Sequence, residues 1–155
     1  MKKELILPVG IPGSGKTYLM NQLYFKSHVI LSLDDMRLAA GSIFNPKIEP
    51  MLKGIYDLVG RSFMIRGQNI VLDSTNVSYN ITKNWINTAK KYDYDTTLIL
   101  MLTDFDVCLK RQTKNVPEEK MRIFVNQFDE LMDIIHTLEV DKIIEVSNGE
   151  MTEWD

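Results

Sequence analysis

Residues 10–17 read Gly-Ile-Pro-Gly-Ser-Gly-Lys-Thr and directly follow an apolar run over residues 5–9. They fit the pattern G-x-x-x-x-G-K-[ST], in which glycines let the backbone wrap so closely that its N–H groups face a phosphate. An apolar strand before the motif and an amphipathic helix after it supply the expected context. The sequence therefore predicts a site for ATP or another nucleoside triphosphate.

Each position of this phosphate loop has an expected role. The Lys16 ammonium would reach the β- and γ-phosphates, and the Thr17 hydroxyl would ligate Mg²⁺. The remaining positions would form the backbone cradle: Gly10, Pro12, Gly13, Ser14 and Gly15. The alternative, a glycine-rich turn that happens to carry a lysine, is disfavoured by the strand and the helix that flank the motif.

A second polar motif, Asp34-Asp35-Met36-Arg37, comes at the end of the next apolar run, residues 28–33. A carboxylate such as Asp34 beside a phosphate loop can accept the proton of an attacking hydroxyl. Arg37 lies one helical turn later on the same side, where its planar guanidinium could hold a phosphate of the acceptor. The residues alone leave an alternative open, in which Asp34 caps the short helix and Arg37 lies in solvent.

Two more polar segments follow later strands. Asp73, after the apolar run at residues 69–72, is placed to hold Mg²⁺ directly or through water. Thr75 and Asn76 could hydrogen-bond the acceptor or could shape a turn, and both interpretations remain open.

The basic segment at residues 109–115 precedes Pro117, the expected first turn of a long helix. Its position is typical of a lid, at about residues 110–117, whose positive side chains close on the triphosphate. Arg111 and Lys114 are the candidates for this contact. A solvated face is the alternative interpretation of such a charge run.

The elements that must position these residues follow from the apolar pattern. Strands are predicted at residues 5–9, 28–33, 69–72, 96–102 and 140–146, and helices at residues 16–25, 34–40, 48–66, 79–92, 106–113 and from Pro117. Strands that alternate with helices predict an α/β fold, a parallel sheet of about five strands with helices on both faces, and the most apolar run, residues 96–102, lies centrally. Ligands of such sheets bind beyond the carboxyl ends of the strands, where the polar motifs fall.

The pattern also assigns a core and a tail. The helix at residues 79–92 is expected to turn four side chains inward: Ile81, Trp85, Ile86 and Ala89. Cys108, between apolar neighbours in a predicted helix, is expected to pack in the core. The polar tail, residues 147–155, is expected to fray.

Composition limits the class of protein. A chain of 155 residues with 45% hydrophobic residues suits one domain with a full core, residues 1–155. The net charge of −3 argues against a protein that coats nucleic acid through a broad basic face. The single cysteine favours the cytoplasm as the location of the protein. The apolar N-terminal run is too short for a signal sequence or a membrane span. His28 and His136 are too isolated for a zinc site.

Together these motifs resemble the kinase domain of phage-type polynucleotide 5′-hydroxyl kinases, within the P-loop kinases built like adenylate kinase. The resemblance rests on the phosphate loop, on Asp34-Asp35-Met36-Arg37, on residues 73–76, and on the basic Leu109-Lys110-Arg111 with the later Val116-Pro117. It extends from about residue 5 to about residue 131. The Asp-Asp-x-Arg element is the most specific of these, because the phosphate loop is shared by a very large superfamily.

The resemblance implies a P-loop NTPase fold and transfer of the γ-phosphate of ATP, with Mg²⁺, to the 5′-hydroxyl of a DNA or RNA end. It implies that Asp34 is the catalytic base and that Arg37 binds the 3′-side phosphate of the terminal nucleotide. Asp73 and Asn76 would lie between the donor and acceptor pockets, and Arg111 would belong to the lid. Lys114 stands near the place of a second lid arginine and would act on phosphate as a point charge.

The resemblance also implies a phage-encoded or bacterial protein of the host cytoplasm. It further implies that a repair role would need a separate phosphatase or ligase. Two alternatives remain: a kinase for a small-molecule, nucleotide or aminoacyl-tRNA hydroxyl, and an ATP-binding switch without transfer. A switch would need no base, so loss of function in Asp34→Ala separates it from either kinase.

Overall fold

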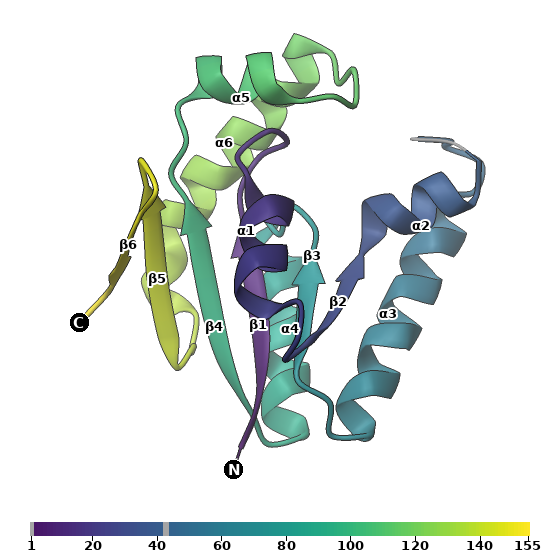
Figure 1. Cartoon of the computed structure of the whole chain (residues 1–155), viewed down its shortest axis with the longest axis vertical. Helices are drawn as coiled ribbons and strands as arrows, with labels where there is room; N and C mark the ends of the chain where they lie inside the picture. The colour runs from purple at the N-terminus through teal and green to yellow at the C-terminus, as the bar shows by residue number, and fades with distance from the viewer. Residues whose placement is uncertain (1, 42–43) are drawn as a thin grey trace.

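The computed structural model of the protein describes residues 2–41 and 44–155. A six-stranded sheet with the order β2-β3-β1-β4-β5-β6 forms its centre (Figure 1). The strands are β1 (Lys3–Val9), β2 (Val29–Ser32), β3 (Ile70–Asp73), β4 (Tyr94–Met101), β5 (Lys142–Ser147) and β6 (Glu150–Glu153). Strands β1 to β5 run parallel to one another, which confirms the predicted parallel sheet and the central place of β4 beside β1.

The prediction of a frayed tail is wrong. Strand β6 pairs antiparallel with β5, and Ser147 lies opposite Glu150 in the ladder. The two residues between them, Asn148 and Gly149, both have positive φ angles, 50° and 79°. Asn-Gly is the pair that a tight two-residue hairpin prefers, so the turn that adds β6 is encoded locally.

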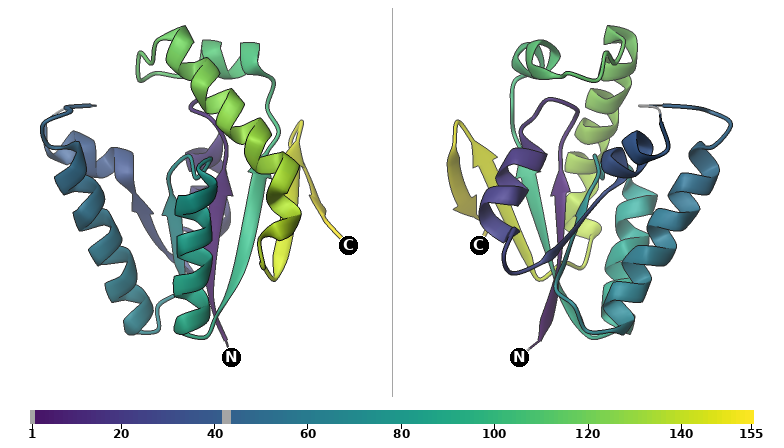
Figure 2. Two further views of the ribbon diagram at one scale, coloured as in Figure 1. Left: turned by 180° about the vertical axis from the view of Figure 1, so that it is seen from behind. Right: turned by 45° about the vertical axis from the view of Figure 1, so that its right-hand side comes forward.

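Helices cover both faces of the sheet, as predicted. Helix α1 (Lys16–Tyr24) covers one face, and α3 (Glu49–Ile65), α4 (Tyr79–Lys91) and α6 (Glu118–Ile134) cover the other (Figure 2). Successive side chains of β1 point to opposite faces of the sheet and so contact both layers of helices. Leu5 and Leu7 pack on the face covered by α3, α4 and α6, whereas Ile6 packs with Met20 of α1.

Buried positions on the helices differ in part from the apolar pattern. On α3 the buried stripe repeats every fourth residue, at Leu52, Tyr56, Gly60 and Met64, whereas Met51 and Ile55 are exposed. On α4 the expected inward positions Trp85, Ile86 and Ala89 are buried. Ile81 was expected to be buried with them, and this expectation is wrong, since it is 50% exposed and lines a cleft. Its apolar character reflects that cleft instead of the core.

Two further helices, α2 (Leu33–Ala39) and α5 (Phe105–Arg111), lie close to the carboxyl ends of the strands, and α5 lies above the end of β4 (Figure 1). The 3-10 turn η1 (Ile135–Thr137) follows α6 and precedes β5. Cys108 of α5 is fully buried with Ile11 and Met121, which confirms its predicted place in the core and fixes α5 and α6 to the phosphate loop. Among the described residues, none of the helices has the length and apolar content that crossing a membrane requires.

Candidate functional site

The phosphate loop runs from the end of β1 to the start of α1. Gly13 and Gly15 have φ angles of 83° and 95°, a region that side chains other than glycine rarely adopt. A Cβ atom on Gly13 would overlap the carbonyl oxygen of Cys108, and one on Gly10 would lie 2.9 Å from Cβ of Met101. The loop is therefore closed tightly against α5 and β4, and only glycine fits at these two positions.

Two side chains of the loop, those of Lys16 and Thr17, make hydrogen bonds within the protein. Lys16 is buried, and its Nζ donates to the carbonyl oxygen of Ile11 at 3.0 Å. Burial lowers the pKa of this ammonium to about 8, although the charge of Asp73 acts in the opposite direction. The Thr17 hydroxyl donates to Oδ2 of Asp73 at 2.8 Å.

These residues fit a nucleoside triphosphate with Mg²⁺. The Thr17 hydroxyl and the Asp73 carboxylate are adjacent oxygen ligands of the kind that Mg²⁺ takes together with phosphate. The buried Ser14 hydroxyl, inside the loop, has no hydrogen-bond partner among the described residues. Those residues contain no group of three or more His, Cys, Asp or Glu that could hold a metal, so Mg²⁺ would share its ligands with the nucleotide.

Asp34 does not cap its helix. Ser32 is the N-cap of α2 and accepts from the N–H of Asp35 at 3.2 Å, whereas Asp34 lies within the first turn. Its Oδ1 accepts from Nη1 of Arg37 at 2.8 Å, and its Oδ2 accepts from Nζ of Lys114. Burial alone would raise the pKa of Asp34, but these two cations outweigh burial and hold the pKa below its usual value. Asp34 is therefore an ionised carboxylate, as a proton acceptor must be.

Arg37 is held by a residue that the sequence does not single out. Its Nε donates to both carboxylate oxygens of Glu49, at 3.0 and 3.2 Å, and Nη2 also donates to Glu49. Glu49 is buried at the start of α3, and the Arg37 side chain is only 20% exposed, so the alternative of a solvated arginine is excluded. Because a guanidinium carries five N–H donors, Arg37 keeps donors for an anion.

Residues 73–76 form the turn after β3, and this turn is hydrogen-bonded to the phosphate loop. Asp73 is buried as the last residue of β3, and burial raises its pKa against the opposing effects of Thr17 and Lys16. The carbonyl oxygen of Thr75 accepts from the N–H of Gly10 at 3.0 Å. Asn76, with a φ angle of 52°, donates from Nδ2 to the carbonyl oxygens of Pro8, Leu72 and Ser74. Its side-chain amide therefore shapes the turn, while Thr75 and Asn76 also line the cleft described below.

The basic segment places its two candidate residues differently. Lys114 reaches Asp34, as described above, and so bridges from the segment after α5 to α2. Arg111 lies exposed at the end of α5. Burial raises the pKa of the Cys108 thiol, and the positive charges of Lys16 and Arg111 act against it. The residue after Arg111, Gln112, lies against the phosphate loop, because a Cβ atom on Gly13 would be 3.0 Å from its backbone nitrogen.

A cleft of about 1140 Å³ opens beside these residues, between α2 and α3 on one side and α4, α6 and the segment after α5 on the other. Asp34, Arg37, Glu49 and Lys114 line it together with Thr75 and Asn76. Its volume suits a nucleotide-sized molecule or a chain end. The structure thus gathers Asp34, Arg37 and Lys114 at one place, next to the turn after β3.

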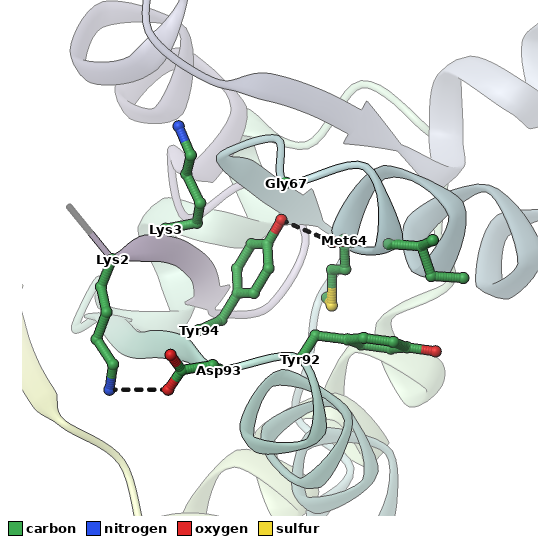
Figure 3. Close-up of a pocket in the computed structure, with 8 residues that line it drawn as sticks. Lys2, Lys3, Met64, Gly67, Tyr92, Asp93 and Tyr94 are labelled. Atoms are coloured by element: carbon green, nitrogen blue, oxygen red, sulfur yellow. Dashed lines mark hydrogen bonds and ion pairs between the residues drawn. The ribbon is translucent and has the colours of Figure 1, made fainter.

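A second hollow of about 460 Å³ lies at the opposite end of the sheet (Figure 3). Lys2 pairs there with Asp93 at 3.4 Å, and the Tyr94 hydroxyl donates to the carbonyl oxygen of Met64 at 3.1 Å. These polar groups satisfy one another at the amino ends of the strands, so this hollow offers no comparable set of reactive groups.

The sequence profile of the AAA domain family AAA_33 matches residues 5–134 of this chain. Among solved structures, a chain of the Pnkp1/Rnl/Hen1 RNA repair complex is 20% identical with a TM-score of 0.75, over 85% of this chain and 46% of that one. A chain of the AvrRxo1-ORF1:-ORF2 complex with ATP is 14% identical with a TM-score of 0.71, over 98% of this chain and 57% of that one. A gluconokinase from Sinorhizobium meliloti 1021 is 11% identical with a TM-score of 0.60, over 94% of this chain and 83% of that one.

At these identities the structural likeness concerns the fold. The chain spans less than half of the length of the chain that it matches in the RNA repair complex. The phosphate loop at the carboxyl ends of a parallel sheet and the match over residues 5–134 agree with each other. The chain belongs to the AAA domain family AAA_33 and has the P-loop NTPase fold.

Proposed function

We propose that the protein is an ATP- and Mg²⁺-dependent kinase that transfers the γ-phosphoryl group to the 5′-hydroxyl of a polynucleotide. One observation carries this proposal: Asp34 is an ionised carboxylate that faces an acceptor-sized cleft beside the phosphate loop. A protein that only binds ATP has no need of such a base. A kinase needs one to orient the attacking hydroxyl and to take its proton.

In the proposed reaction a bond forms between the acceptor oxygen and the γ-phosphorus, and the bond from that phosphorus to the β,γ-bridging oxygen breaks. Asp34 takes the proton of the hydroxyl. Its Oδ1 stays bonded to Arg37, so Oδ2 is the oxygen that becomes available when Lys114 moves away from it. Lys114 is then free to lie against the transferred phosphoryl group, where its charge offsets the developing negative charge.

The nucleotide is proposed to lie on the other side of the transfer. Lys16 would contact the β- and γ-phosphates, and Thr17 and Asp73 would hold Mg²⁺. The metal would neutralise phosphate charge when bound. Arg111, which precedes Gln112 at the phosphate loop, would act on the donor, whereas Lys114 would act between donor and acceptor.

The acceptor assignment rests on Asp34 with Arg37 and on the charge of the cleft. The donors that Arg37 keeps can hold the 3′-side phosphate of a terminal nucleotide. Three further cations, Lys53, Arg61 and Lys91, lie along the cleft on α3 and α4, where the next phosphates of a chain could pass. The similar fold within an RNA repair complex supports the same class of acceptor.

The test is transfer of labelled γ-phosphate from ATP to a short oligonucleotide with a 5′-hydroxyl. Asp34→Asn should abolish transfer while ATP binding persists, because the amide cannot accept the proton. The matched control is Asp35→Asn, which changes an exposed carboxylate in the same turn and should transfer normally. Equal loss in both variants, or full transfer by Asp34→Asn, would contradict the proposal.

A kinase for a small hydroxyl compound is the second candidate. The observation that favours it is the clamp of Glu49 on Arg37, which occupies the forked edge of the guanidinium with a carboxylate. A 3′-nucleotide and its unphosphorylated nucleoside separate the two candidates. Preference for the 3′-nucleotide that disappears in Arg37→Ala supports a polynucleotide end, whereas equal use of both supports the small acceptor.

A further inference from the structure

Tyr56 carries a buried hydroxyl with no partner. It lies on α3 in the lining of the acceptor cleft, it is 4% exposed, and its hydroxyl makes no hydrogen bond with any described residue. Buried polar groups in folded proteins are nearly always paired, because leaving one unpaired costs about 1–3 kcal/mol. Phenylalanine would fill the same space without that cost. The contacts of the free protein therefore do not explain why this position carries a hydroxyl group.

The ring is held in place. It packs edge-on against Trp85, with the ring centroids 6.3 Å apart and the planes at 83°. Gly60, one turn further along α3, leaves room for the Trp85 ring, since a Cβ there would lie 2.9 Å from it. The ring that carries the buried hydroxyl is thus held at the wall of the cleft by a rigid aromatic pair, and little ordering of the side chain would be needed when a ligand arrives.

The charges around Tyr56 select the kind of ligand group. Burial raises the pKa of its hydroxyl well above the usual value, and the negative charges of Asp73, Asp57 and Asp34 raise it further. The phenol therefore keeps its proton and can donate it in a hydrogen bond. Asp34 is paired with Arg37 and Lys114, but the negative charges of Asp73 and Asp57 disfavour an anionic oxygen at this point. The group that fits is an uncharged oxygen.

We propose that the Tyr56 hydroxyl hydrogen-bonds to an oxygen of the sugar that carries the attacking hydroxyl. This inference rests on the proposed function and assigns different parts of the acceptor to different residues: Tyr56 takes the neutral sugar, and Arg37 takes the phosphate that follows it. The apolar residues Leu33, Val77 and Trp85 line the same cleft, which suits a sugar and its base better than a phosphate.

The test is the variant Tyr56→Phe, which removes one oxygen atom. We expect kcat/KM for a 5′-hydroxyl oligonucleotide to fall about 10-fold, mainly through a higher KM for the acceptor, with KM for ATP unchanged. The melting temperature should stay the same or rise, because the variant no longer buries an unpaired hydroxyl. A loss confined to ribo-oligonucleotides would identify the 2′-hydroxyl as the partner, and a loss shared with deoxy-oligonucleotides would identify another sugar oxygen.

The control is Tyr94→Phe, which makes the same chemical change outside the cleft. The Tyr94 hydroxyl donates to the carbonyl oxygen of Met64 at 3.1 Å (Figure 3) and to that of Gln68 at 2.8 Å. Its loss should lower the melting temperature and leave the kinetics unchanged, the reverse of the pattern expected for Tyr56→Phe.

Normal transfer by the wild type together with unchanged acceptor KM in Tyr56→Phe would overturn this inference and leave the proposed function standing. If the wild type transfers nothing, binding of the same oligonucleotide followed by fluorescence anisotropy still decides the point. Binding about 10-fold weaker in Tyr56→Phe supports the sugar contact. Equal binding by the two proteins, or none by either, overturns it, and absent transfer separately overturns the proposed function.

Discussion

Asp34 is held between two cations that come from different parts of the chain. Arg37 is three residues away on the same helix, whereas Lys114 comes from the segment after α5. Both lower the pKa of the carboxyl. Because the proposed transfer requires Lys114 to move away from Oδ2, we expect the ionisation of Asp34 to depend on the position of the basic segment.

Lys114→Ala should reveal this coupling. We expect kcat to fall roughly 100-fold, because a charge that stabilises the transferred phosphoryl group is lost. The pKa of Asp34 in the free protein should rise without its cation, so the acid limb of the pH profile of kcat/KM should move to higher pH. Lys110→Ala, which changes an exposed lysine of α5, is the control and should keep the wild-type profile. An unmoved acid limb in Lys114→Ala would show that this lysine does not act on Asp34.

The buried Lys16 predicts how nucleotide affinity depends on pH. Its pKa of about 8 in the free protein means that the ammonium loses its proton as the pH rises through that value. Affinity for ATP should therefore be about tenfold weaker at about pH 9 than at about pH 7. Calorimetric titration at each pH measures this, and Lys16→Met should bind weakly at both. A pH-independent affinity in the wild type would contradict the role given to this charge.

The lowered pKa of Lys16 also makes the free energy of unfolding depend on pH. This dependence has the opposite sign to that of ATP affinity, since stability rises with pH. Because the folded-state pKa lies below the ordinary value of 10.5, the unfolded chain binds the proton more tightly between about pH 8 and that value. Burial of the charged form thus costs stability below about pH 8. This cost in stability diminishes as the pH rises from about 8 toward 10.5.

At the scale of residues, the sequence could predict those that belong to local motifs. Lys16, Thr17, Asp34 and Asp73 lie where the strand ends predict them. Glu49 and Tyr56 could not be found in this way, because their importance depends on packing of α3 against α2 and α4. A glutamate at a helix start and a tyrosine in a helix have ordinary explanations until the fold places them beside Arg37 and Trp85.

At the scale of elements, the contact between α3 and α4 shapes the cleft. Two glycines of α3 provide a matched test of it. A Cβ on Gly60 would lie 2.9 Å from the Trp85 ring and 3.3 Å from Leu72, whereas a Cβ on Gly54 would meet nothing within 4 Å. Gly60→Ala should lower the free energy of unfolding by about 1–3 kcal/mol through overpacking.

Gly54→Ala should instead raise the free energy of unfolding by about 0.5–1 kcal/mol, because alanine favours the helix and restricts the unfolded chain. Urea unfolding of the two variants measures both values. A stabilised Gly60→Ala would mean that the helices do not approach as closely as described.

The order of elements could be read from the sequence, because continuous apolar runs alternate with helical spacing. The faces of the helices were harder to assign. Met51 and Ile55 of α3 are apolar but exposed, and Ile81 of α4 lines the cleft. Periodicity reports apolar residues without telling whether they meet the core, a ligand cleft or solvent. Strand β6 was missed although its Asn148-Gly149 turn is a strong local signal.

At the scale of the molecule, charge is distributed unevenly. The chain has a net charge of −3, yet the acceptor cleft is lined by six basic residues and three acidic ones. The overall charge argues against a protein that coats nucleic acid, and the basic residues of the cleft would supply the local attraction that the proposed chain end requires. Binding of a short acceptor should accordingly weaken as salt is added.

The most direct test of the central claim uses two oligonucleotides that differ only at the 5′ end, one with a hydroxyl and one with a phosphate. Both are incubated in one reaction with the protein, Mg²⁺ and γ-labelled ATP. The proposed function predicts label on the 5′-hydroxyl strand alone, and none with Asp34→Asn. Label on neither strand, while ATP is bound, would contradict a polynucleotide 5′-kinase, and label on both would place the transferred phosphate elsewhere than at the 5′ end.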